Sequence, residues 1–370
     1  MKVYLVGLDE EKPIVVGKVK VYLVWFDSLG AKSSCVRVET PKLNVLIDPG
    51  AAAMQPSYPL PDSLKLKYLN DAFKNIVLHA KKSNVIVISH YHHDHYVNPK
   101  LYPQVYHDKM LLVKNPNMWI NRSQWFRARE FILDLINVLK CPIDFNELLI
   151  EPKRRRFKDP VEKLKIALSK DFGDYQPRRL ELLEKGKLWF KSMVDMWTSR
   201  HWVREFKCDH VNVRFVDGKT LEVNGVKLKF SKPSFHGIEY ERTGWVFSTV
   251  IEYGKVKFMH SSDLQGPQIE DYAAMIVKEN PNVLVVDGPP TYLLGYMMNL
   301  TNFKRALDNM VYIIENLSRV ELIIYDHHLL RAKSYREKVR SVYEAAKRSD
   351  VKVLTAAEWY GEKPLIDRIA

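Results

Sequence analysis

Four histidines and one aspartate lie together in residues 89–96, where the chain reads Ser-His-Tyr-His-His-Asp-His-Tyr. The short, apolar and β-branched run just before them, residues 85–88, predicts a buried strand, so the cluster falls on the loop at the strand's carboxyl end. Functional residues are common on loops that a rigid strand positions. Imidazoles and carboxylates are ligands for zinc, manganese and ferrous iron. The loop therefore predicts a metal site.

The composition of this cluster favours a catalytic site over a structural one. A closed structural zinc site normally has four ligands, several of them cysteines, and the chain holds only Cys35, Cys141 and Cys208, far apart in sequence. A catalytic site keeps a coordination position open for water. Five candidate ligands within six residues are more than one ion takes from so short a loop, which predicts two metals. The alternative is an exposed histidine-rich loop that binds metals adventitiously.

The spacing His90-x-His92-x-Asp94-His95 resembles the His-x-His-x-Asp-His signature of the metallo-β-lactamase superfamily and is complete at every signature position. Four other segments resemble the superfamily's remaining motifs and follow in the same order along the chain. They are residues 43–50, with Asp48; residues 235–237, with His236; residues 257–263, with Asp263; and residues 322–328, with His327 and His328. Within the superfamily, the combination is most similar to an archaeal family of predicted metal-dependent hydrolases.

The resemblance implies a ligand set for two divalent metal ions, with zinc expected first and manganese or iron as alternatives. The ligands expected for the first metal are His90, His92 and His236. Those expected for the second metal are Asp94, His95 and either His327 or His328, with Asp263 bridging the two ions.

Further roles follow from the same resemblance. Asp48 is expected behind the site, where it would accept a hydrogen bond that orients a ligand or the loop. Its alternative is a structural role as the first residue of an Asp-Pro-Gly turn. His327 is preferred to His328 because Arg331 follows it by four residues, a spacing similar to that of the transfer-RNA-processing branch. His328 stays open as the ligand.

The chemistry expected of such a centre is hydrolysis by a metal-bridging hydroxide. Two divalent ions about 3.5–4 Å apart lower the pKa of a shared water and stabilise the oxygen on which negative charge develops. Asp94 would orient or deprotonate that water. The candidates for protonating the leaving group are His260, His328 and Tyr96, each with the alternative of a spare hydrogen-bonding side chain. Arg331 would contact an anionic substrate, the alternative being a solvated arginine.

Length and composition indicate a cytoplasmic enzyme. With 370 residues and 46% hydrophobic content, the chain can bury a large core, and its length allows two or three domains. The sequence contains no run of eighteen apolar residues, so it predicts no membrane span. Residues 1–7 look like a strand rather than a signal peptide. Three scattered cysteines predict no disulfide framework.

The order of the predicted elements favours an α/β (α+β) fold. The predicted strands are residues 18–26, 34–39, 43–48, 282–287, 321–325 and 351–354, with hairpins in residues 221–230, about Asn224-Gly225, and in residues 245–260, about Gly254. The predicted helices are residues 62–82, 302–318 and 334–348. In each half of the chain, a run of strands is followed by helices. This order fits two packed sheets with helices outside, which is the αββα sandwich implied by the resemblance.

A long segment separates His95 from His236 and predicts a helical insertion. Its predicted helices are residues 118–139, 161–170, 177–188 and 191–206. We therefore expect a hydrolase domain in residues 1–113 and 210–370, with an inserted cap in residues 114–209 beside the mouth of the active site. This place of insertion departs from the β-CASP nuclease branch, whose extra domain enters later in the chain.

The net charge of +13 favours an anionic substrate or partner, RNA or single-stranded DNA among them. Basic residues and aromatic rings alternate within the predicted cap, as single-stranded nucleic acid requires. They include Lys153, Arg154, Arg155, Arg156, Trp119, Arg122, Trp125, Phe126, Arg127, Arg129, Trp189, Trp197, Arg200 and Trp202. The favoured interpretation is that the rings form the cap's own core while the charges face solvent.

Three functions are consistent with this sequence. The first is a dinuclear metal-dependent hydrolase acting on a phosphodiester of RNA or DNA, whose binding would weaken steeply with salt. The second is a hydrolase of a small anionic ester, lactone or phosphoester. A closed apolar pocket under the cap would favour this function. The third is a non-catalytic nucleic-acid-binding protein that retains the metals.

Overall fold

The computed structural model describes residues 12–369, and it contains two mixed β-sheets. The strand expected at residues 1–7 lies outside the described residues. The first sheet has eight strands in the order β1-β2-β3-β4-β5-β6-β10-β9. They are β1 (Ile14–Val16), β2 (Val19–Phe26), β3 (Ser34–Glu39), β4 (Asn44–Ile47), β5 (Val85–Ile88), β6 (Lys109–Val113), β9 (Phe206–Cys208) and β10 (Val211–Phe215).

The second sheet has seven strands in the order β11-β12-β15-β16-β17-β18-β19. They are β11 (Thr220–Val223), β12 (Val226–Phe230), β15 (Thr249–Tyr253), β16 (Val256–His260), β17 (Val283–Asp287), β18 (Leu322–Asp326) and β19 (Val353–Leu354). Two small pairs complete the strands: β13 (Ser234–Phe235) with β14 (Trp245–Val246), and β7 (Leu149–Ile150) with β8 (Trp202–Val203). The hairpin predicted at Asn224-Gly225 is present, and both residues have the positive φ that this tight turn requires.

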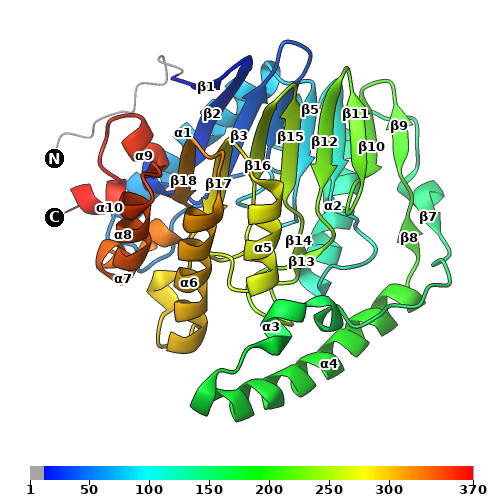
Figure 1. Ribbon diagram of the computed structural model, residues 1–370. Helices are drawn as coiled ribbons and strands as arrows, with labels where there is room; N and C mark the ends of the chain where they lie inside the picture. Colours follow the sequence, from blue (N-terminus) through cyan, green and yellow to red (C-terminus); the bar gives the residue numbers. More distant parts are fainter. Residues whose placement is uncertain (1–11, 370) are drawn as a thin grey trace.

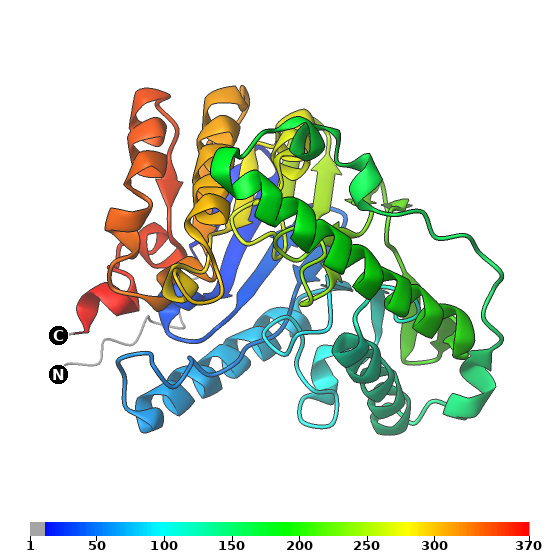
Figure 2. The ribbon, with the colours of Figure 1, turned by 90° about the horizontal axis from the view of Figure 1, so that it is seen from below.

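Helices cover the outer face of each sheet, which confirms the predicted αββα sandwich (Figures 1 and 2). Helices α1 (Asp62–Lys81) and α2 (Arg122–Val138) lie on one side, and α5 (Glu270–Glu279), α6 (Leu300–Asn316) and α8 (Arg340–Arg348) lie on the other. The remaining helices are α3 (Lys165–Ser169), α4 (Gln176–Ser199), α7 (Tyr335–Lys338), α9 (Ala356–Trp359) and α10 (Leu365–Arg368). Within the described residues, none of them combines the length and apolar character that crossing a bilayer requires.

The inner faces of the two sheets share one hydrophobic core. Side chains at alternate positions of the first sheet, such as Val36 and Val38, pack with Leu228, Ile251 and Phe258 of the second, and all are fully or almost fully buried. This alternation follows from the pleat, which sends successive side chains to opposite faces. A larger cluster fills the space between each sheet and its helices.

Several predicted helix boundaries are wrong. Residues 161–170 form a 3₁₀ turn at Val161–Lys163 followed by the short α3, and residues 202–203, predicted as helix, form β8. Residues 177–188 and 191–206 are not two helices, because α4 runs without interruption from Gln176 to Ser199. Its buried residues Leu183, Phe190 and Trp197 keep a helical spacing across the predicted break, so one apolar face spans the whole length. Conversely, residues 334–348 form two helices, because the chain turns out of helical geometry at Val339.

The cysteines are also paired differently from the prediction. Cys141, which follows α2, forms a disulfide with Cys208 in β9, across 67 residues of sequence. Cys35 is free and buried. The expectation that the scattered cysteines make no disulfide is therefore wrong. Sequence spacing could not reveal the pair, because the contact depends on β9 returning beside the carboxyl end of α2.

Candidate metal centre

The predicted ligands lie at one edge of the sandwich because the strands that carry them end there. β4 and β5 are parallel neighbours, so Asp48 and the loop that begins at Ser89 leave the first sheet together. β16, β17 and β18 are also parallel, which brings Asp263 and His327 to the corresponding edge of the second sheet. His236 directly follows β13.

The first group of convergent side chains contains His90, His92, His236 and Asp263. His90 Nε2 lies 3.0 Å from His92 Nδ1 and 3.5 Å from Asp263 Oδ2. His236 Nε2 lies 3.2 Å from the same carboxylate oxygen. One ligand atom from each of the four residues lies within 4.8 Å of the others, so the structure brings together the residues predicted for the first metal.

A second group contains Asp94, His95 and His327, next to the same Asp263. His95 Nε2 lies 3.0 Å from Asp263 Oδ2, and His327 Nε2 lies 3.6 Å from Asp263 Oδ1. The carboxylate of Asp94 lies 4.0 Å from His95 Nε2 and 3.8 Å from His327 Nε2. Asp263 therefore stands between the two groups, which is the position predicted for a bridging ligand.

Buried atoms that make no hydrogen bond indicate that these side chains fit metal ions. His95 Nε2, His327 Nε2 and both carboxylate oxygens of Asp263 are buried and make no hydrogen bond, although they face one another as ion pairs at 3.0–3.6 Å. Leaving such atoms without a hydrogen bond is costly, so native proteins rarely do so without an ion or water. Ligand atoms that surround an ion at about 2.0–2.2 Å lie roughly 3.3 Å from one another. The separations around Asp263 are of this size.

Asp48 holds the ligand loop from behind. Its carboxylate accepts hydrogen bonds from the backbone N–H of Ser89 at 2.7 Å and from the Ser89 hydroxyl at 2.6 Å. The same carboxylate lies 2.9 Å from His95 Nδ1. With the Nδ1 proton held by Asp48, the Nε2 lone pair of His95 points toward Asp263. The structure thus gives Asp48 the orienting contact that was expected of it.

Gly50 lets the Asp-Pro-Gly turn pack directly on the ligand loop. A Cβ atom built at Gly50 would lie only 2.1 Å from the backbone nitrogen of Tyr96 and 2.5 Å from that of His95. The close approach is between two backbones, so a side chain at residue 50 could not move aside. This glycine is therefore needed for the position of the loop.

Asp27 is a functional residue that the sequence analysis missed. It follows β2 and is completely buried, with its Oδ1 only 2.7 Å from His327 Nδ1. Its Oδ2 accepts hydrogen bonds from Arg331 Nε at 2.6 Å and from the backbone N–H of His328 at 3.0 Å. Burial raises the pKa of Asp27, but Arg331 and His327 outweigh it and hold that pKa well below its ordinary value. The available signal was an aspartate directly after an apolar strand, as at Asp48.

Arg331 is not the solvated arginine of the alternative interpretation. It is 6% exposed, paired with Asp27, and its Nη2 lies 3.8 Å from Asp94. His328 also approaches the centre, with Nε2 3.7 Å from Asp263 Oδ2 and Nδ1 3.1 Å from Asp287. The choice between the adjacent histidines stays a prediction. It is supported by the Nε2 of His327, which makes no hydrogen bond, and by the contact of His327 with Asp27.

His260 lies behind the centre, and its contacts support the alternative interpretation of a spare hydrogen-bonding side chain. Its Nε2 lies 2.9 Å from the Ser34 carbonyl oxygen, and its Nδ1 accepts a hydrogen bond from the Ser262 N–H. Both ring nitrogens are thus engaged by the protein. Tyr96 has its ring packed against Phe131, and burial raises the pKa of its hydroxyl.

Most aromatic rings of residues 114–209 pack inward. The ring of Trp119 stacks on Phe190 with centroids 5.6 Å apart, and Trp189 stacks on Trp245 at 5.2 Å. Trp197 is fully buried among them. This agrees with the interpretation that the rings form a core. The basic run of residues 153–156 is exposed.

Comparisons with known proteins agree with this geometry. The family model of the metallo-beta-lactamase superfamily matches residues 30–147. A UPF0282 protein of Methanocaldococcus jannaschii is 32% identical over 357 residues, which cover 94% of this chain and 93% of that protein. A UPF0282 protein of Korarchaeum cryptofilum is 27% identical over 340 residues, covering 92% of this chain and 88% of that protein.

Two solved structures match at much lower sequence identity. The metallo-beta-lactamase fold protein YhfI from Bacillus subtilis matches with a TM-score of 0.43 and 11% identity, over 91% of this chain and 95% of that one. Unliganded yeast PDE1 matches with a TM-score of 0.41 and 10% identity, over 91% and 97%. From the family model and the curated relatives, the chain belongs to the archaeal UPF0282 protein family within the metallo-β-lactamase superfamily, whose members are generally metal-dependent hydrolases.

Proposed function

We propose that the protein is a dinuclear metal-dependent hydrolase that cleaves a phosphodiester of RNA or DNA. The observation that carries the metal-dependent part is the set of buried ligand atoms on His95, His327 and Asp263 that make no hydrogen bond. The net charge of +13 and the cationic side chains around Asp94 support an anionic substrate.

Two sets of residues would hold the ions, with Asp263 shared between them. The first set is His90, His92 and His236, and the second is Asp94, His95 and His327. When bound, a pair of divalent ions supplies an activated water at neutral pH and positive charge for the oxygen that becomes negative. Imidazole and carboxylate ligands suit zinc, with manganese or iron as alternatives.

Asp94 is the ligand best placed to handle the attacking water. Its side chain is 16% exposed, whereas those of His95, Asp263 and His327 are at most 1% exposed. Burial raises the pKa of Asp94, but His95, His327 and Arg331 outweigh it and keep the pKa below its ordinary value. An ionised carboxylate at the open side can accept a hydrogen bond from the water and orient it toward the substrate.

Two cationic side chains near Asp94 would stabilise an anionic substrate. Arg331 lies 3.8 Å from the Asp94 carboxylate and is held in place by Asp27. Lys32 is partly buried beside the same groups, and burial and the charge of Arg331 lower the pKa of its ammonium. A phosphodiester bound at the centre would add the negative charge that this arrangement of cations favours.

Residues 114–209 would serve as a cap on this centre. Gln124 of α2 reaches the ligand loop, with its Nε2 3.3 Å from His92 Nε2 and its Oε1 accepting a hydrogen bond from the Tyr91 N–H. The long helix α4 runs past the ends of the strands on the lower side of the molecule (Figures 1 and 2). Arg179 of α4 is bonded to the buried Glu239, which Arg305 of α6 also holds.

The test is a screen of the metal-reconstituted protein against model phosphodiesters, RNA, single-stranded DNA, lactones and thioesters. His92→Ala serves as the blank, since it removes one predicted ligand. Hydrolysis of the phosphodiesters and nucleic acids alone is the expected result. Turnover confined to lactones or thioesters would replace the substrate proposed here, and the absence of turnover with every compound in the screen would contradict the hydrolase.

Two further measurements separate the remaining functions. Binding to RNA or single-stranded DNA is expected to weaken steeply as salt rises, because basic side chains release counterions from phosphates. Asp94→Ala should abolish turnover and leave nucleic-acid binding largely unchanged. Loss of binding in Asp94→Ala, without any turnover in the parent protein, would favour a non-catalytic binding protein.

A further inference from the structure

A second group of metal-ligating side chains lies away from the candidate metal centre, beside the edge strand β9. His107 and Asp108 directly precede β6, and His210 directly precedes β10. β6 and β10 are parallel neighbours, with Lys109 opposite Val211, so their first residues meet at the same end of the sheet. We refer to His107, Asp108 and His210 as the edge cluster.

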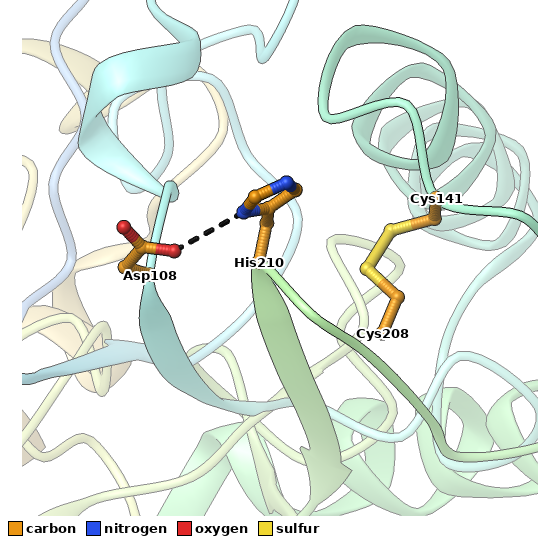
Figure 3. The surroundings of a disulfide bond; sticks show 4 residues. All are labelled: Asp108, Cys141, Cys208 and His210. Atoms are coloured by element: carbon orange, nitrogen blue, oxygen red, sulfur yellow. Dashed lines mark hydrogen bonds and ion pairs between the residues drawn. A yellow bond between two sulfur atoms is a disulfide. The ribbon is translucent and has the colours of Figure 1, made fainter.

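The three side chains of the edge cluster converge. The carboxylate of Asp108 lies 2.9 Å from His107 Nδ1 through one oxygen and 3.3 Å from His210 Nδ1 through the other. The two imidazole rings stack, with centroids 4.6 Å apart and planes 27° apart. One ligand atom from each residue lies within 4.8 Å of the other two. Figure 3 shows Asp108 facing His210 across the starts of the two strands.

The backbone fixes this arrangement. The N–H of Asp108 donates a hydrogen bond to the carbonyl oxygen of His210 at 2.7 Å, which ties the two chain segments together. Asp108 has a φ of 58°, a left-handed conformation that non-glycine residues seldom adopt. The backbone therefore holds the three residues next to one another before any ion binds, which lowers the cost of bringing the ligands together.

We propose that the edge cluster binds one divalent transition-metal ion, of the class that includes zinc, nickel and copper. Two imidazoles and one carboxylate form a donor set that these ions accept, whereas calcium and magnesium require mostly oxygen ligands. The side chains of His107, His210 and Asp108 are 49%, 45% and 64% exposed, so water can fill the remaining coordination positions.

Electrostatics in the edge cluster also favour an ion. The Asp108 carboxylate lies between the two stacked imidazoles, 2.9 Å from His107 Nδ1 and 3.3 Å from His210 Nδ1. A divalent ion bound to the rings would be attracted to this carboxylate.

The position of the edge cluster gives the ion a structural role. The chain re-enters the first sheet here after the long segment between β6 and β10, through the short hairpin of β9 and β10. Cys208 lies at the end of β9, two residues before His210, and is already bonded to Cys141 (Figure 3). An ion bound to His107, Asp108 and His210 would link the turn between β9 and β10 to the start of β6.

Equilibrium dialysis against buffered Zn²⁺ tests the proposal on the full chain. His107→Ala and His210→Ala are each expected to bind about one equivalent less zinc than the parent protein. His201→Ala is the matched control, because His201 is an exposed histidine with a single carboxylate partner, Glu151 at 2.9 Å. It should bind as much zinc as the parent. The same loss of about one equivalent should persist in the His92→Ala background, which separates this site from the candidate metal centre.

A second measurement follows the backbone beside the edge cluster. Zn²⁺ should slow amide hydrogen exchange in residues 206–211 of the parent protein, and His210→Ala should lose that protection. Equal zinc content in the parent, His107→Ala and His210→Ala, with native circular dichroism spectra, would overturn the proposal. So would unchanged exchange in residues 206–211 when zinc is added to the parent protein.

Discussion

Asp27 Oδ1 lies 2.7 Å from Nδ1 of His327, although 300 positions separate the two residues in the sequence. Asp27 comes from the first sheet and His327 from the second, so this contact joins the two halves of the sandwich at the candidate metal centre. The carboxylate fixes which nitrogen of His327 carries the proton and leaves Nε2 for a metal ion.

Asp27→Asn should therefore weaken metal binding without removing a ligand. Loss of a carboxylate behind a ligating histidine typically lowers metal affinity by about 10–100-fold. The variant also removes the nearer of the two carboxylates that face the buried Arg331, which should lower the free energy of unfolding by up to about 3–5 kcal/mol. Metal titration of the folded fraction and urea unfolding measure the two effects.

Asp367→Asn is a suitable control for this variant, because Asp367 pairs with Arg336 and Tyr335 and has no contact with the centre. Its metal affinity should equal that of the parent protein. Equal affinity in Asp27→Asn would show that the Asp27 carboxylate does not orient His327.

His92→Ala should lose metal and hydrolysis together, because His92 is one of the four residues of the first group and its Nδ1 lies 3.0 Å from His90 Nε2. Metal content per chain and turnover measure this. His93→Ala is the matched control, since His93 is the exposed neighbour of His92 and belongs to neither group of convergent ligands. A metal-free preparation with full activity would refute the metal-dependent mechanism.

Gly50→Ala should destabilise the ligand loop. The new Cβ would lie 2.1 Å from the backbone nitrogen of Tyr96, and relief of such overpacking usually costs about 1–3 kcal/mol or more. The midpoint temperature of thermal unfolding and the metal content per chain should both fall. Gly173→Ala is the comparison, because its Cβ would meet nothing within 4 Å, so only the cost of its positive φ remains. Equal metal content in Gly50→Ala and the parent would contradict the close approach.

Glu239 should make the protein sensitive to acid. Burial raises its pKa, but Arg305 and Arg179 outweigh burial and lower the pKa to about 2. Because the folded-state pKa lies below the unfolded one, the stabilisation is complete above about pH 5 and is lost as the pH falls toward 2. The lowered pKa corresponds to about 3 kcal/mol at neutral pH.

Urea unfolding of the parent and Glu239→Gln over this range of pH measures the effect. Glu239→Gln should be less stable at pH 7, because it removes the buried negative charge that Arg179 and Arg305 share. The difference between the two proteins should shrink as the pH falls. A difference that stays constant with pH would show that the Glu239 charge is not responsible.

The sequence predicted those parts of the centre that depend on local order. The loop of residues 89–96 has its ligands within one turn, and Asp48 and Asp263 each follow an apolar strand, so strand periodicity and the family motifs sufficed. Asp27 was missed because its role arises only when β2 and β18 end side by side. Gln124, which reaches His92 from the inserted segment, was missed because this contact also exists only in the folded chain.

The same distinction holds for the fold. Strands such as β5 and the Asn224-Gly225 hairpin have strong local signals and were predicted almost to the residue. The predicted break in α4 falls at Trp189 and Phe190, and the structure places both rings inside one continuous helix, packed on Trp245 of the neighbouring segment. The disulfide between Cys141 and Cys208 depends on a contact across 67 residues, which spacing alone does not encode.

The ligands around Asp263 come from both sheets, and this has a consequence for the order of folding. His90, His92 and His95 lie on the loop that follows β5 of the first sheet. Asp263 and His327 lie on loops that follow β16 and β18 of the second sheet. A complete coordination shell can form only after the two sheets have docked, which requires contacts of long sequence separation and is therefore slow. Tight capture of the ions would be a late kinetic event that stabilises correctly docked chains over partly folded ones.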